Sequence, residues 1–176
     1  MSQVIKRLAP TTAALLALLA LSPAASQTSA LKGHDSRAPV DFAADRIEVQ
    51  DRADRAIFSG NVVATQGQLK LTAPRVTFVY SNVGGLELKR MDASGGVTVS
   101  SPSETARGEF AIYDFDSRLI TLIGGVSLIR SDSRVSGGRL VIDLASGRAV
   151  MDGAGPSGVR TEGGRVTGTF NVPQRD

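Results

Sequence analysis

Residues 56–67 read AIFSGNVVATQG, which places apolar side chains two positions before and two positions after Gly60. Similar surroundings recur at three later glycines: Gly95, Gly124 and Gly153. Recurrence at a fixed interval is typical of stacked supersecondary units. This stretch therefore predicts a fold built from repeated segments rather than from one irregular domain.

A series of small residues sets the length of the repeat. Each one begins a stretch in which apolar residues alternate with others: Ala44, Ala73, Gly108 and Gly137. The gaps between them are 29, 35 and 29 residues, and an insertion of six residues near 81–86 accounts for the longer gap. The chain thus contains four β units, which bury their apolar faces only against each other and leave the ends of the array open. The recurring glycines are expected either at bulges or close backbone approaches or at the ends of strands, and their fixed interval slightly favours the bulge.

The alternation has a period of two from Val40 onward, as in half-buried strands. No later stretch keeps a helical apolar face for three turns, so the fold class is all-β. Because side chains alternate across a strand, the apolar positions of all four units share one inward face of an elongated, twisted pair of sheets. On the opposite face Phe110 and Ile112 form an apolar strip, which we expect to be covered rather than exposed.

The N-terminus has the features of a secretory signal peptide. Lys6 and Arg7 precede an apolar run over 13–21 and then small residues, and the run is too short to span a bilayer. We expect a cleaved signal peptide over 1–26, a flexible leader over 27–38, a single β domain over 39–172 and a short tail over 173–176. The first strand, 40–44, and the last, 170–172, are candidates for pairing with another molecule.

Composition excludes several classes of protein. The chain has 20 basic and 17 acidic residues, and removal of the signal peptide leaves 18 against 17, so no basic footprint for nucleic acid remains. Without cysteine, thiol catalysis and cysteine metal sites are excluded. The single histidine, His34, falls in the expected leader, where we expect it to be solvated. Acidic pairs fall at strand ends, where aspartate favours turns. No catalytic site, metal or cofactor is expected.

The stretch at 56–67 resembles the signature of the LptA/OstA-like family of periplasmic lipopolysaccharide-transport bridges. Residues 44–49 (ADRIEV), 119–126 (LITLIGGV) and 135–140 (VSGGRL) are similar to other elements of that family. The resemblance spans about 40–152. Pro74 departs from the family pattern where an aspartate is expected, and because it lacks an amide donor it predicts a bulge or sheet edge there.

The resemblance implies an OstA-like twisted β-jellyroll that is open at both ends and lies in the periplasm. It implies transfer of lipopolysaccharide between an LptC-like inner-membrane partner and an LptD-like outer-membrane partner, with head-to-tail self-association and with the acyl chains held on the apolar interior. The inward-facing candidates for lipid contact are Phe42, Ile47, Val49, Phe58, Val62, Leu69, Leu71, Val76, Phe78, Tyr113, Leu122, Val126, Leu128, Leu140 and Ile142.

Two alternatives stay open at this level. An exported β-solenoid with a structural or carbohydrate-binding role would share the repeat, although it often shows more repeats and exposed aromatic platforms. A membrane-anchored LptC-like relative would share the fold but keep its N-terminal segment as an anchor.

Overall fold

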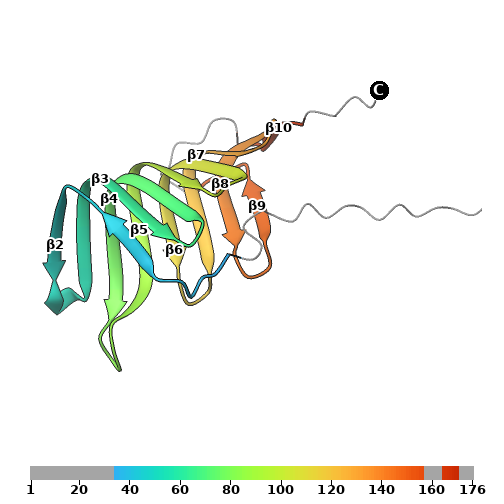
Figure 1. Cartoon of the computed structure of the whole chain (residues 1–176). Coiled ribbons are helices and arrows are strands. Elements are labelled where there is room, and N and C mark those ends of the chain that lie inside the picture. The colour runs from blue at the N-terminus through green and yellow to red at the C-terminus, as the bar shows by residue number, and fades with distance from the viewer. Residues whose placement is uncertain (1–33, 157–163, 171–176) are drawn as a thin grey trace, which may run out of the picture.

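The computed structural model describes residues 34–156 and 164–170. Within them, the strands form a single ten-stranded antiparallel sheet (Figure 1). The strands are β1 Val40–Ala43, β2 Arg46–Gln50, β3 Arg55–Gln66, β4 Leu69–Ser81, β5 Glu87–Ser100, β6 Glu104–Asp114, β7 Leu119–Arg130, β8 Ser133–Asp143, β9 Arg148–Asp152 and β10 Thr167–Thr169. The expected signal peptide, the first part of the leader and the tail over 173–176 lie outside the described residues.

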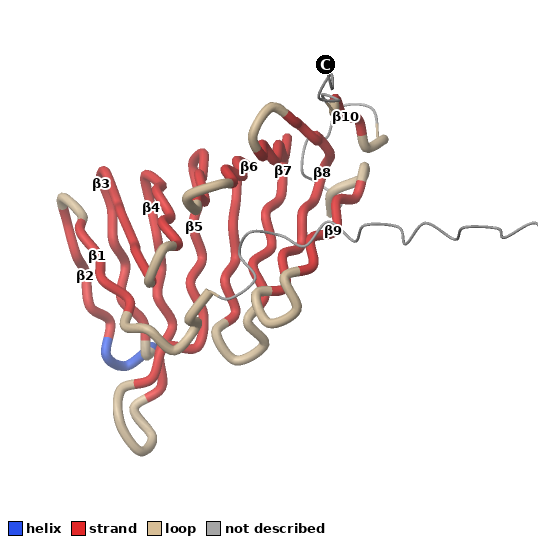
Figure 2. Tube along the Cα trace, turned by 45° about the vertical axis from the view of Figure 1, so that its right-hand side comes forward, coloured by secondary structure: helices blue, strands red, loops and turns tan. Residues whose placement is uncertain are grey.

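The expected turns join these strands. A short 3-10 helix, η1 (Asp51–Ala53), links β2 to β3 and is the helical turn in Figure 2. Asp114 accepts a hydrogen bond from the amide of Ser117 (2.7 Å), and Asp143 accepts from the amides of the β8–β9 turn. The contact of Asp114 confirms its expected role in turn geometry, and Asp143 has the same role.

Each of the long strands, β3 to β8, is bent near its middle. They follow one another as antiparallel hairpins, and the register of every ladder between them shifts at the bend. Gly60, Gly95 and Gly124 lie at these shifts with φ of 78°, 92° and 85°. The interpretation of the recurring glycines as bulge residues is thus confirmed for these three. Pro74 also falls within a shift, between Thr72 and Arg75, as its missing donor predicts.

The bends divide the sheet into two halves that face each other. In the β1 half, β1 pairs with residues 63–66 of β3; in the β2 half, β2 pairs with residues 55–59 of the same strand. At the other end, β10 continues the β1 half and β9 continues the β2 half. The ring of Phe42 on β1 lies 4.5 Å from that of Phe58 and 5.9 Å from that of Phe78, both in the β2 half. The space between the halves is therefore the core, as in a jellyroll.

The small residues of the repeat lie at the bends, not at the starts of strands as expected. Ala73, Gly108 and Gly137 stand directly opposite Val62, Val97 and Val126 on the neighbouring strands. The physical reason is that little space is left for a side chain at the bend. A Cβ on Gly137 would lie 2.6 Å from the carbonyl oxygen of Asp152 on β9.

The predicted inward face is confirmed as one face by the register. One ladder row runs through all the central strands: Phe58, Val76, Ala93, Ala111, Leu122 and Leu140. Every member of this row is at most 3% exposed. The repeat therefore gives both the period and the side of the sheet that is buried.

The outer face carries a strip that the sequence pattern predicted to be covered. Phe110 is 38% exposed, and its ladder neighbours on that face are Ser94 and Ile123. Ile112, two positions along, is half-buried. The expectation was wrong for Phe110 because each half of the folded sheet is packed on its inner side.

The two ends of the array are edge strands. Within the described residues, β1 and β2 pair only with β3, and β9 and β10 pair only with β8. The last described strand is Thr167–Thr169 rather than the expected 170–172. Phe170 follows it and is 58% exposed, and the final two positions of the expected strand lie outside the described residues.

Candidate functional site: the apolar interior

The candidate site is the space between the β1 half and the β2 half. Eleven of the fifteen residues proposed for lipid contact line it and are at most 5% exposed: Phe58, Val62, Leu69, Leu71, Val76, Phe78, Tyr113, Leu122, Val126, Leu140 and Ile142. Leu128 is half-buried against the same core. Burial of this many apolar side chains accounts for stability without disulfides.

Phe42, Ile47 and Val49 differ from the other candidates because they are 51%, 50% and 60% exposed. They nonetheless point to the inner face, since Ile47 stands opposite Phe58 and Phe42 packs on its ring. Their exposure follows from their place on the edge strands β1 and β2, which have no neighbour on one side. The apolar face thus continues from the buried interior to an uncovered edge.

A polar residue stands among the apolar ones at one rim of the interior. Gln66, at the end of β3, is 4% exposed, and its amide makes four hydrogen bonds. The oxygen Oε1 accepts from the hydroxyl of Tyr113 (2.9 Å) in the opposite half and lies 3.0 Å from His34 Nε2. Burial raises the pKa of Tyr113 to about 12, against a smaller opposing effect of the Arg118 charge. The contact ties the two halves together.

The nitrogen of the same amide holds the segment before β1. Gln66 Nε2 donates to the carbonyl oxygens of Ser36 (3.0 Å) and Ala38 (2.9 Å). Residues 34–38 were expected to be part of a flexible leader with a solvated His34. The expectation for His34 is wrong, because His34 is half-buried beside Gln66. The backbone of this segment also satisfies a buried amide that needs partners.

The interior contains one buried carboxylate among the described residues. Glu104, at the start of β6, is 5% exposed and pairs with Arg130 at the end of the neighbouring strand β7. A buried charge needs such a partner. Apart from this pair, Gln66 and the hydroxyl of Tyr113, the buried side chains of the inner face are apolar, so the face offers contact area rather than charged anchor points.

The space between the halves is filled by the packed core, whose apolar side chains are at most 6% exposed. At the rim near Gln66, the two halves leave an opening lined by apolar residues and two polar ones: Val40, Ala64, Thr65, Gln66, Leu69, Leu71, Met91 and Phe115. The free volume there is about 10 Å³, which holds roughly one water molecule. An acyl chain needs many times that volume, so lipid entry requires the halves or the segment before β1 to move.

The described residues do not form a group of three or more histidine, cysteine or acidic side chains that could hold a metal. Nor does this part of the chain contain a helix of the length and hydropathy needed to cross a membrane. The side chains that line the interior offer apolar contact, with hydrogen-bonding groups at the rim near Gln66.

Sequence reasoning missed several members of the core. Met91, Val99, Ile120 and Leu144 are at most 4% exposed, yet none was proposed for the site. Each stands two positions from a residue already assigned to the inward face, so extending the alternation by one step would have found them. The same step from Val62 through Ala64 reaches Gln66, whose polar character hid its inward direction.

The fold and the site together define a class of protein: an open-ended, bent antiparallel sheet whose two halves enclose a long apolar interior. The family model described as LptA/(LptD N-terminal domain) LPS transport protein matches residues 42–148. The chain therefore belongs to this family of lipopolysaccharide-transport proteins.

Two individual proteins are similar to this chain. A protein of Rhizobium meliloti (strain 1021), described as uncharacterized, is 29% identical over 150 residues, covering 81% of each chain. The crystal structure of LptH from Pseudomonas aeruginosa, described as the LptA-homologous periplasmic component of the lipopolysaccharide transport device, matches with a TM-score of 0.71. It covers 79% of this chain and 99% of LptH at 22% identity, so it supports the fold.

Proposed function

We propose that this protein binds lipopolysaccharide in the periplasm and forms part of a bridge that carries it from the inner to the outer membrane. The acyl chains lie between the β1 half and the β2 half, in contact with the inner-face residues. Family membership supports the transport role, and the apolar interior supports the mode of binding.

The observation that carries this proposal is the uncovered edge of the inner face. Large apolar side chains are exposed at Phe42, Ile47 and Val49, in line with the buried rows behind them. Exposed apolar surface continuous with a core is typical of an interaction site. Each methylene that leaves water contributes about 0.8 kcal/mol, so a few carbons of one chain sheltered here already favour binding. A surface without charged pockets also lets the lipid slide onward.

The same edges support a proposal for assembly. One end of the molecule presents β1 and β2, and the other presents β9 and β10, each paired on one side only within the described residues. Such strands are templates for further strands. Head-to-tail stacking of copies, and docking to LptC-like and LptD-like partners, would join the inner faces into one apolar track.

Native mass spectrometry of the exported chain tests the lipid proposal. We expect an adduct with intact lipopolysaccharide and none with the same material after alkaline removal of its acyl chains. A double variant, Ile47→Ser with Val49→Ser, should weaken the adduct, because these edge positions are exposed and change little of the packed core. Val83→Ser, at a side chain 92% exposed in the β4–β5 turn, is the matched control. Equal adducts with intact and deacylated material would refute binding through acyl chains.

A further inference from the structure

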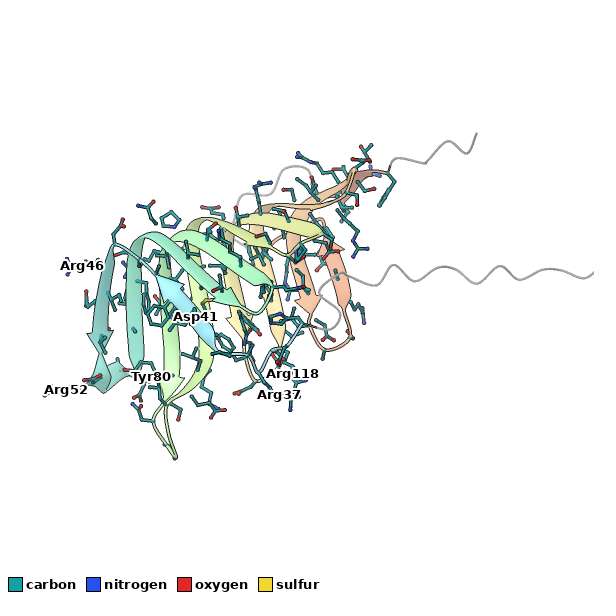
Figure 3. All side chains as sticks on the ribbon, in the orientation of Figure 1. Arg37, Asp41, Arg46, Arg52, Tyr80 and Arg118 are labelled. Atoms are coloured by element: carbon teal, nitrogen blue, oxygen red, sulfur yellow. The ribbon has the colours of Figure 1, made fainter. Side chains whose placement is uncertain are left out.

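The segment before β1 lies beside an opening of the apolar interior, because Gln66 lines this opening and bonds the segment. Residues 34–39, here called the strap, run along the rim of the sheet, where Figure 3 places Arg37 on the strap and Arg118 in the turn between β6 and β7. The adjacent opening is lined by Val40 and Leu69 of the β1 half and by Met91 and Phe115 of the β2 half. The strap therefore stands where the two halves separate at this rim.

Among the described residues outside the strap, the side chain that holds it by hydrogen bonds is that of Gln66. Gln66 donates to the carbonyl oxygens of Ser36 and Ala38, and its own oxygen is fixed by Tyr113 and His34. The strap also folds on itself, since the amide of Ala38 donates to the carbonyl oxygen of Asp35 (3.1 Å). The hydrogen bonds between Gln66 and the strap are here called the latch. Because its bonds at Ser36 and Ala38 are made to backbone carbonyl oxygens, they do not depend on the identity of those side chains.

The latch is weak compared with the packing around it. It consists of three hydrogen bonds between the strap and one amide, made at Ser36, Ala38 and His34, and each contributes little net free energy because release exchanges it for a bond to water. The strap itself contributes half-buried residues at most, whereas the apolar side chains beneath the opening, Leu69, Leu71 and Met91, are each at most 5% exposed. Release of the strap is thus the opening movement that costs least at this rim, and it uncovers an apolar surface.

We propose that the strap is a latched cover over a lateral entrance to the interior, and that a lipid acyl chain displaces it. The chain enters between Leu69 and Met91 while Gln66 gives up its contacts with Ser36 and Ala38. This inference rests on the proposed function, because it names how the same apolar interior is entered. It assigns Gln66 a positioning role that controls access, and it makes entry possible from the side as well as from the edge at β1 and β2.

The absence of cysteine from the chain provides a direct reporter. A single Ala38→Cys substitution places a half-buried thiol on the strap, and the rate of maleimide labelling measures its release. Arg37→Cys, at an exposed neighbouring position, controls for general accessibility. Intact lipopolysaccharide should accelerate labelling at residue 38 several-fold, deacylated lipopolysaccharide should not, and labelling at residue 37 should stay constant.

The latch is tested in the same background. Gln66→Ala removes all three hydrogen bonds to the strap, at His34, Ser36 and Ala38, and should raise the labelling rate at residue 38 about tenfold without lipid. It should also tighten lipopolysaccharide binding, because the lipid no longer has to displace a latched strap. Gln68→Ala, an exposed glutamine two positions along, should change neither value. Hydrogen exchange at the amide of Ala38 in the chain without the cysteine gives the same comparison free of any effect of the thiol.

The outcomes separate the two proposals. Lipopolysaccharide adducts in native mass spectrometry without any change of labelling or exchange at residue 38 would overturn the strap and leave the proposed function standing. Equal labelling in Gln66→Ala and Gln68→Ala would overturn the latch. Absence of any adduct would overturn the proposed function and the strap entrance together.

Discussion

Substitution of Gly60 by alanine should destabilise the protein by about 2–3 kcal/mol. Gly60 has φ of 78°, a conformation that costs a residue with a Cβ about 1–2 kcal/mol. The new Cβ would also lie 2.3 Å from Oδ2 of Asp45 and 2.9 Å from its Cβ. Asp45 would have to move, which breaks its 2.9 Å hydrogen bond from Asn61 Nδ2 and costs about 1 kcal/mol more.

Two comparisons separate these contributions. Gly67 has φ of 55°, and a Cβ added there would meet nothing within 4 Å, so Gly67→Ala should show the backbone cost alone, about 1 kcal/mol. In an Asp45→Gly background the collision is absent, and Gly60→Ala should then cost about as much as Gly67→Ala. Equilibrium unfolding in urea gives each free energy. If Gly60→Ala costs no more than Gly67→Ala in the original background, then Asp45, between β1 and β2, does not approach Gly60 as closely as the structure shows.

Three further predictions concern the edges and the rim. Phe42→Pro should weaken docking to an LptC-like partner about tenfold more than Phe42→Ala, since only the proline removes a strand amide; equal binding by both in a pull-down or surface-plasmon assay would count against pairing through β1. Gly137→Ala should cost about 2 kcal/mol and speed hydrogen exchange in β9, because its Cβ would lie 2.8 Å from Met151 Cγ and closer still to Asp152; unchanged exchange would contradict this. Between pH 10 and 12 the free energy of unfolding should fall, because Tyr113 holds its proton up to about 12 when folded and releases it near 10 when unfolded. Tyr113→Phe should flatten this fall, and a fall of the same size in the variant would refute the assignment.

The repeat predicted most of the fold because burial in this architecture alternates along each strand, so that every second residue faces inward. Phe58 and Val62 flank a bulge glycine, and their counterparts in later units take the same ladder positions. The face of the sheet follows from alternation alone. How strongly each inward residue is covered does not. Ile47 and Val49 obey the pattern yet are exposed, because coverage depends on whether another strand follows, and that is a property of the whole array.

The rim of the site could be predicted only in part. Gln66 stands at a position that the alternation assigns to the inner face, so the direction of its side chain could be predicted. Its partners were not, because it bonds the backbone carbonyls of Ser36 and Ala38, groups that every residue possesses. Residues 34–38 have no periodicity, and nothing in their composition distinguishes a latched strap from a solvated leader. Contact between Gln66 and Tyr113, 47 positions apart, likewise depends on how the halves close.

Photo-crosslinking along the strands tests the central claim, that acyl chains lie between the two halves, most directly. A photo-reactive residue placed at Phe58, Phe78 or Leu140, all inward and at most 3% exposed, should capture lipopolysaccharide in cells. The same residue at Thr77, the outward neighbour of Phe78, or at the exposed Lys70 should not. We expect capture at the inward positions of a strand and none at the outward positions between them. Capture at Lys70 and Thr77 with none at the three inward positions would contradict it.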